Sequence, residues 1–128
     1  MQPPIIMLVS GDPEVERAAS AAARMTRNPL IVSRTAHEAV NEFSRGFEDV
    51  GLLLVDLDGD VHGVTLFNAL DDCHGLAPIV VITSYEEAYM KPLALDRGAV
   101  DCLGKPVSAD CFSHLFESFH PSRKAHQG

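Results

Sequence analysis

One stretch of the sequence constrains the fold more than any other: the apolar run Leu-Leu-Leu-Val at residues 52–55, which ends abruptly at Asp56. Four large aliphatic residues in a row leave no polar face, which is typical of a central strand in a parallel sheet covered by helices on both sides. Asp56 would lie at the carboxyl end of this strand, the edge where open α/β sheets bind ligands. We therefore take Asp56 as a candidate functional residue, with the plain alternative that it only begins a turn.

The rest of the chain alternates short apolar segments with amphipathic ones. Strands are expected at residues 5–9, 30–32, 52–56, 79–84 and 100–103. Helices are expected at residues 13–25, 35–45, 64–74 and 108–119, with Asp12, Thr35 and Ser108 as N-terminal caps. Pro92 predicts a loose turn over residues 85–90, with a regular helix starting only near Pro92. The alternation predicts a parallel sheet with right-handed crossovers and helices on both faces.

A length of 128 residues suits one domain, which we place at residues 1–120, followed by a polar tail or truncated linker at residues 121–128. The longest apolar runs have about five residues, too short to span a membrane. No basic residue precedes the first of these runs, so a signal peptide is not expected, and a cytoplasmic location without membrane contact is the default. The net charge of −8 counts against direct binding to nucleic acid.

The three cysteines are Cys73, Cys102 and Cys111, an odd number with no pair spaced as in a zinc knuckle or a redox motif. This pattern predicts reduced and mostly buried thiols. A metal site built from His62, Cys73 and His74 is disfavoured, because adjacent Cys and His side chains do not easily bind one ion together.

Polar side chains fall at the predicted carboxyl ends of four strands: Ser10 and Asp12, Asp56, Thr83 and Ser84, and Lys105. These ends share one edge of a parallel sheet, so we expect the side chains to converge in one crevice. A carboxylate, a hydroxyl and an ammonium group together suit a site that accepts a phosphoryl group. Asp56 would be the nucleophile, and Thr83 and Lys105 would bind the phosphoryl oxygens. The alternatives are an ordinary strand residue for Thr83 and a solvated charge for Lys105.

Three segments together resemble the receiver domain of bacterial two-component response regulators. They are Leu-Leu-Val-Asp-Leu at residues 53–57, Pro-Ile-Val-Val-Ile-Thr at residues 78–83, and the segment from Gly98 to Pro106. The resemblance covers residues 5–119 and implies a single flavodoxin-like, doubly wound (βα)5 sheet with strand order 2-1-3-4-5. It also implies that Asp56 is the phosphoacceptor, Thr83 the switch hydroxyl and Lys105 the lysine that pairs with the phosphoryl oxygens.

The same resemblance implies partners. Upstream we expect a sensor histidine kinase or a phosphotransfer protein, and downstream an output domain or a partner protein. A homodimer is compatible with this role. The domain would be regulatory and not an enzyme, apart from self-phosphorylation of Asp56 from a phosphodonor.

One departure from the family concerns the metal. Receiver domains usually carry two adjacent acidic residues directly after the first strand, and these hold the Mg²⁺ that phosphorylation requires. This chain has Ser10 and Gly11 there. Of the usual ligands only Asp56 remains, with Asp12 and Asp58 as candidate substitutes, and Asp12 has the alternative of serving only as a helix cap. We therefore expect Mg²⁺ binding, and with it phosphorylation, to be weak or absent.

Further departures affect the output side. The loop at residues 59–63 lacks the usual Pro, Cys102 replaces an aromatic ring in the fifth strand, and Pro92 interrupts a helix. The leading hypothesis is therefore a pseudo-receiver that acts through protein contacts. The alternative is a small enzyme or ligand-binding protein on the same scaffold. Flavin or nucleotide binding is disfavoured, because residues 10–13 lack both the glycine pattern of a dinucleotide site and a P-loop lysine.

Overall fold

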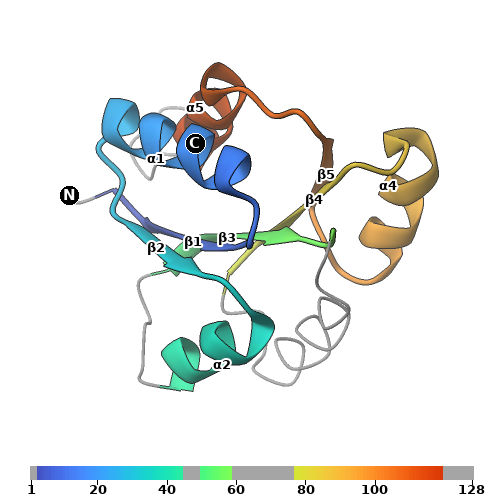
Figure 1. Ribbon diagram of the computed structural model, residues 1–128, viewed down its shortest axis with the longest axis horizontal. Coiled ribbons are helices and arrows are strands. Elements are labelled where there is room, and N and C mark those ends of the chain that lie inside the picture. Colours follow the sequence, from blue (N-terminus) through green and yellow to red (C-terminus); the bar gives the residue numbers. More distant parts are fainter. Residues whose placement is uncertain (1–2, 45–49, 59–76, 120–128) are drawn as a thin grey trace, which may run out of the picture.

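The computed structural model describes residues 3–44, 50–58 and 77–119, in which a five-stranded parallel sheet lies between helices. The strands are β1 (Ile5–Val9), β2 (Leu30–Ser33), β3 (Val50–Asp56), β4 (Ile79–Thr83) and β5 (Asp101–Gly104). The helices are α1 (Pro13–Thr26), α2 (Ala36–Ser44), α4 (Glu87–Asp96) and α5 (Ala109–Ser118). Figure 1 shows α1 and α5 on one face of the sheet and α2 on the other. The strand order is β2-β1-β3-β4-β5, which confirms the predicted doubly wound, flavodoxin-like fold.

β3 lies at the centre of the sheet because its side chains are apolar on both faces. Leu53 and Val55 belong to the core cluster on the α2 side, whereas Leu52 and Leu54 pack with Phe112 on the side of α1 and α5. This alternation follows from the two-residue repeat of a strand. All four strand residues are fully buried, and each stabilises the fold by about 2 kcal/mol through leaving water. The packing therefore fixes the position of the carboxyl end of β3.

The helices begin at the caps that the sequence predicts. Asp12, Thr35 and Ser108 each accept a hydrogen bond from a backbone N–H of the first turn, at 2.9, 3.2 and 3.1 Å respectively. In α5 the rings of Phe112 and Phe116 are fully buried, with centroids 5.8 Å apart. Strand boundaries differ from the predicted ones by two residues or fewer. Within the described ranges, no helix has the length and apolar character needed to cross a membrane.

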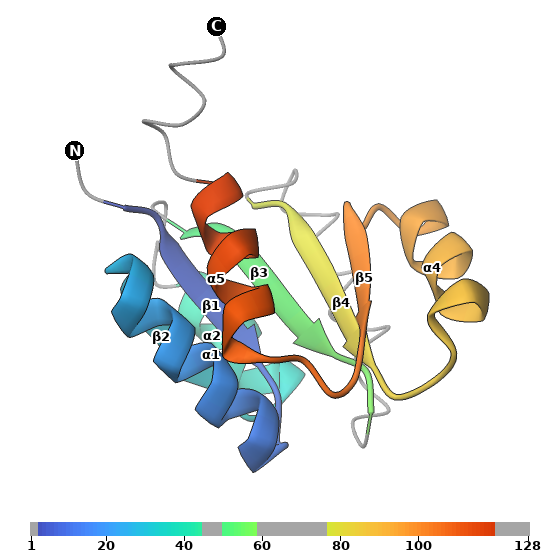
Figure 2. The same cartoon turned by 90° about the horizontal axis from the view of Figure 1, so that it is seen from above.

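The predicted interruption at Pro92 is wrong. α4 runs through Pro92 without a break, so a helix replaces most of the turn expected over residues 85–90. The fixed φ angle of proline suits a helix, and its main cost is the missing hydrogen bond to the carbonyl of Ala88. Packing offsets this cost, because Ala94 is buried and Met90 packs against the core cluster below the helix. Figure 2 shows α4 beside β5 at one end of the sheet.

The prediction of mostly buried thiols is correct for Cys102 and wrong for Cys111. Cys102 is buried in β5, but Cys111 is exposed because it lies on a side of α5 other than the one that buries Phe112 and Phe116. Other expectations fall outside the described residues: the helix at 64–74, the loop at 59–63, the tail at 121–128, and the side chains of His62, Cys73 and His74.

Candidate functional site at the carboxyl edge of the sheet

Four strands bring polar side chains to one edge of the sheet. β3 ends at Asp56 and β4 ends at Thr83, while Ser10 and Lys105 directly follow β1 and β5. The parallel register places these ends level, since Asp56 pairs with the residue before Thr83, and Thr83 pairs with the residue before Lys105. Figure 2 shows β3 and β4 pointing toward the same end of the sheet. The structure thus brings together the residues that the sequence pattern selected.

Lys105 is the centre of this site. Its ammonium nitrogen lies 2.8 Å from Asp12 Oδ2, 2.9 Å from Asp56 Oδ2 and 3.3 Å from Asp58 Oδ2. Burial disfavours the charged form of Lys105, but the contacts with Asp12 and Asp56 outweigh burial and raise its pKa well above the ordinary value. Lys105 therefore stays protonated, and a single ammonium group is shared among three carboxylates.

Both carboxylate oxygens of Asp56 are engaged. Oδ1 accepts a hydrogen bond from the backbone N–H of Asp58 at 2.9 Å. Oδ2 accepts one from the Ser10 hydroxyl at 2.7 Å and also contacts the ammonium group of Lys105. The Asp56 side chain is only 1% exposed, so water hardly competes with these partners. The carboxylate is firmly held, and it has few lone pairs left for an incoming group.

Asp58 lies in the turn after β3 and contacts the end of β4. Its Oδ1 accepts a hydrogen bond from Thr83 Oγ1 at 3.0 Å, and its Oδ2 accepts one from the backbone N–H of Ser84 at 2.7 Å. Burial raises the pKa of Asp58, but the hydrogen bonds from Ser84, Thr83 and Lys105 outweigh burial, so the pKa lies below its ordinary value. The acceptor of the Thr83 hydroxyl is thus Asp58 and not the candidate phosphoacceptor Asp56.

Asp12 has two roles at once, because each of its oxygens has a different partner. Oδ1 caps α1 by accepting a hydrogen bond from the Glu14 N–H, while Oδ2 contacts Lys105. The hydrogen bond from Lys105, followed by the one from Glu14, lowers the pKa of Asp12. The structure confirms the predicted helix cap and adds a contact with Lys105, whereas Asp12 as a Mg²⁺ ligand stays a prediction. A depression of about 370 Å³ beside them is lined by Asp12, Glu14, Val15, Lys105, Pro106 and Val107.

The sequence pattern places Ser10 and Ser84 at this edge but does not assign the roles that they have in the structure. The Ser10 hydroxyl and the backbone N–H of Ser84 are donors to the carboxylates of the site. Sequence comparison with receiver domains marks Ser10 mainly as a lost carboxylate. Its position directly after a buried strand is the signal that points to the hydroxyl. No signal in the sequence marks the Ser84 amide, since every residue other than proline carries such a group.

The resemblance implies Mg²⁺ at this site, and the described residues do not fit that ion as they stand. Mg²⁺ needs an octahedral set of oxygen ligands with free lone pairs. Here the oxygens of Asp56 already accept hydrogen bonds, and the ammonium group of Lys105 acts as the cation between three carboxylates. Among residues 3–44, 50–58 and 77–119, no three His, Cys, Asp or Glu side chains are arranged to hold a metal ion.

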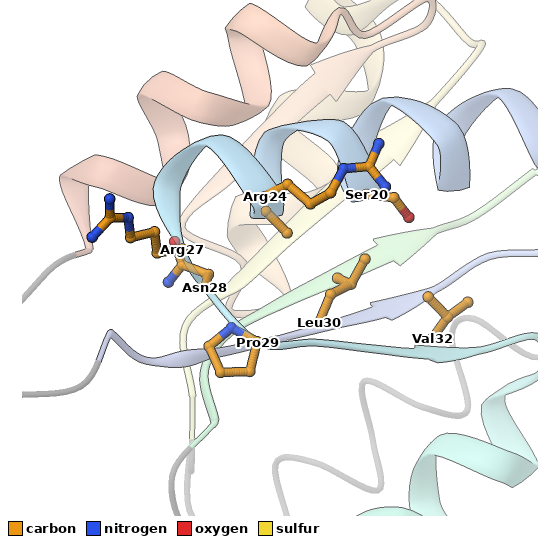
Figure 3. Close-up of a pocket in the computed structure, with 8 residues that line it drawn as sticks. Ser20, Arg24, Arg27, Asn28, Pro29, Leu30 and Val32 are labelled. Carbon is orange, nitrogen blue, oxygen red and sulfur yellow. The ribbon is translucent and has the colours of Figure 1, made fainter.

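A larger cavity, of about 590 Å³, lies between the C-terminal half of α1 and β2. Figure 3 shows Arg24 and Arg27 of α1 and the turn after it, together with Leu30 and Val32 of β2, along this cavity. Arg24 is about 18 Å along the helix axis from Asp12. The residues that line the cavity include no carboxylate, thiol or histidine. The alternative interpretation of a small enzyme therefore gains no support from it.

Comparisons with known proteins agree on the fold. No family model and no curated protein matches the sequence. The BeF3-activated receiver domain of nitrogen regulatory protein C is 21% identical, with a TM-score of 0.77 over 100% of both chains. A chain from the co-crystal structure of the Saccharomyces cerevisiae phosphotransfer protein Ypd1 with the receiver domain of Ssk1 is also 21% identical, with a TM-score of 0.72 over 96% of this chain and 93% of that one.

A third solved structure is a longer protein. NtrX from Brucella abortus is 20% identical, with a TM-score of 0.80, and the match covers 99% of this chain and 28% of NtrX. The chain therefore has the fold of response regulator receiver domains. The resemblance found in the sequence is confirmed at the level of the fold.

Proposed function

We propose that this chain is a receiver-like signalling module of a two-component or phosphorelay system, that it acts through protein contacts, and that Asp56 is a weak phosphoacceptor. The fold it shares with receiver domains supports the first part. The observation that carries the last part is the engagement of Asp56 at both oxygens, by the Asp58 N–H on one side and by Ser10 and Lys105 on the other.

Phosphorylation requires an oxygen of Asp56 to attack phosphorus. The attacking carboxylate and the phosphoryl oxygens repel each other, and a bound cation normally reduces this repulsion. Lys105 supplies positive charge next to Asp56, but Asp12 and Asp58 compete for it. We infer that Mg²⁺ binds weakly or not at all, and that Asp56 consequently reacts slowly with phosphodonors.

A module of this kind acts through surfaces that other proteins bind. Tyr89, Leu93 and Leu95 of α4 and Val100 after it are large apolar residues between 42% and 68% exposed. Tyr89 and Leu93 are one helical turn apart and share a face of α4. We propose this face as the contact for an output domain, a partner protein or a second copy of the chain. Upstream partners would be a sensor histidine kinase or a phosphotransfer protein, the latter by analogy with Ypd1, which was crystallised with a receiver domain.

Intact-mass analysis of the full chain after incubation with acetyl phosphate and millimolar Mg²⁺ tests the weak-acceptor proposal. The unaltered protein should gain little phosphoryl mass, and the Asp56→Asn variant should gain none. A receiver domain that is known to react, treated in parallel, shows that the phosphodonor is active. Near-complete single modification of the unaltered protein that disappears in Asp56→Asn would overturn the proposal.

A further inference from the structure

The carboxylate of Asp58 is held by three donors from separate parts of the chain. The Ser84 N–H lies 2.7 Å away, the Thr83 hydroxyl 3.0 Å and the Lys105 ammonium group 3.3 Å. Lys105 is the most distant of the three, so a simple ion pair does not explain where the carboxylate lies. The hydrogen bonds from the end of β4 define its position, and the side chain is only 18% exposed.

These donors are of the kind that binds an oxyanion. A hydroxyl, a backbone N–H and an ammonium group at fixed positions stabilise negatively charged oxygens. The strand ends fix them here, because Thr83 is fully buried and its carbonyl accepts a hydrogen bond from the Lys105 N–H at 2.8 Å. The donors are therefore held together by β4 and β5, independently of the turn that carries Asp58.

The turn after β3 is itself pinned, which keeps Asp58 facing these donors. The Leu57 N–H donates to the carbonyl of Ile82 at 2.9 Å, and the Asp58 N–H donates to Asp56 Oδ1 at the same distance. Little conformational freedom remains to be lost when the Asp58 carboxylate meets its partners. A tethered carboxylate also outcompetes a free anion, because the chain keeps its local concentration high.

The resemblance to receiver domains already implies that Thr83 and Lys105 bind phosphoryl oxygens. We propose that in this chain Asp58 occupies that pocket, which includes the Ser84 N–H, as an intramolecular carboxylate, and that a free tetrahedral oxyanion such as inorganic phosphate enters it once the carboxylate is removed. This inference rests on the proposed function, because its consequence concerns the phosphorylation of Asp56. A phosphoryl group on Asp56 would have to displace Asp58 before it met the Thr83 hydroxyl and the Ser84 N–H, whereas Lys105 already contacts Asp56. While Asp56 is unphosphorylated, the hydrogen bond to Asp58 keeps the Thr83 hydroxyl turned toward the site.

Phosphate titrations of the full chain, followed by the NMR signal of the Ser84 amide, test this pocket. Asp58→Ala removes the occupant, whereas Asp58→Asn removes its charge but keeps an amide oxygen in the pocket. We expect inorganic phosphate to shift the Ser84 signal saturably in Asp58→Ala. Binding to the unaltered protein and to Asp58→Asn should be weaker by about tenfold or more, the factor that loss of one good hydrogen bond produces.

The matched control is Asp96→Ala, which removes an exposed carboxylate at the end of α4. It changes the net charge as Asp58→Ala does and should behave like the unaltered protein. Asp58→Ser, whose side chain is too short to fill the pocket, should give the same result as Asp58→Ala and replaces it if that variant does not fold.

Three outcomes would overturn the inference. Phosphate could bind Asp58→Ala no better than Asp96→Ala, or it could bind the unaltered protein equally well. If the affinity for phosphate rose equally in Asp58→Ala and Asp58→Asn, the charge of Asp58 alone, and not its occupancy of the pocket, would govern phosphate binding. Because free phosphate requires no reaction at Asp56, these results are separate from labelling by acetyl phosphate, which tests the weak-acceptor proposal.

Discussion

The Ser10 hydroxyl donates a hydrogen bond of 2.7 Å to Asp56 Oδ2, which joins the turn after β1 to the end of β3. The Ser10 hydroxyl oxygen in turn accepts a hydrogen bond from the Asp12 N–H at 3.1 Å, and Ser10 is 3% exposed. Ser10 therefore gives Asp56 a hydrogen-bond donor, where an acid at this position would offer further oxygens to a cation.

Replacing the turn after β1 by acids should create metal binding. In Ser10→Asp/Gly11→Asp the donor to Asp56 is lost and two carboxylates are added. A Cβ at Gly11 would meet no atom closer than the Arg34 carbonyl oxygen at 4.0 Å, so the new side chain has room. We expect Mg²⁺ affinity, measured by calorimetry, to rise at least about tenfold, or about 1.4 kcal/mol. Labelling of Asp56 by acetyl phosphate should rise with it.

The control for this variant is Ser10→Asn/Gly11→Asn, which has similar size but adds no charge and should leave Mg²⁺ binding unchanged. If the unaltered protein already binds Mg²⁺ as tightly as the acidic variant, then Asp12 or Asp58 provides the missing ligands. The weak-acceptor proposal would fail in that case.

Removing the ammonium group in Lys105→Met should destabilise the fold. Asp12, Asp56 and Asp58 would remain close together without their shared cation. We expect the free energy of unfolding in urea to fall by about 2–3 kcal/mol, less than for a fully buried pair because Asp12 and Asp58 are partly exposed. Added Mg²⁺ should restore part of this loss, since no ammonium group then competes for the carboxylates.

Lys91→Met is the matched control for this loss. Lys91 pairs with Asp101 at 3.3 Å, and both side chains are exposed, so this substitution should cost less than about 1 kcal/mol. Equal losses in the two variants would show that the cluster around Lys105 contributes no more than a surface ion pair.

Acidification should destabilise the protein near pH 4. Asp12 and Asp58 have lowered pKa values in the folded state, so the unfolded chain binds protons first as the pH falls through about 3.9. Their contribution is fully present above about pH 5 and is lost as the pH falls toward the folded-state pKa values. Urea unfolding at a series of pH values measures this dependence. The free energy of unfolding should depend less steeply on pH in Asp58→Asn than in the unaltered protein. An unchanged slope would contradict a contribution from Asp58.

Replacing Pro92 by alanine should stabilise α4. The alanine would restore a backbone N–H that can donate to the Ala88 carbonyl, and the side chain at this position is exposed. The greater freedom of alanine in the unfolded chain offsets part of the gain, so we expect about 1–2 kcal/mol. In the unaltered protein, amide hydrogen exchange should be faster in α4 than in α5, and the substitution should reduce the difference. Uniform strong protection of both helices before substitution would contradict this.

Local patterns in the sequence were sufficient for most of the fold. Residues 52–55 predict a central strand because four aliphatic side chains leave no polar face, and the structure places them in the core on both sides of β3. Asp12 and Ser108 mark helix starts because a short polar side chain can accept a hydrogen bond from the first turn. The clustering of Asp56 with Lys105 follows from strand ends that share one edge.

Tertiary packing alone decided the rest. α4 continues through Pro92 because Met90 and Ala94 pack in the core against the sheet. Helix propensity depends on the local sequence alone and does not include that tertiary contact. The partner of the Thr83 hydroxyl is Asp58, 25 residues away in the chain. That pairing depends on how closely the turn after β3 approaches the end of β4. Only the folded sheet brings these two chain segments together, so the spacing of residues in the sequence does not encode the distance between them.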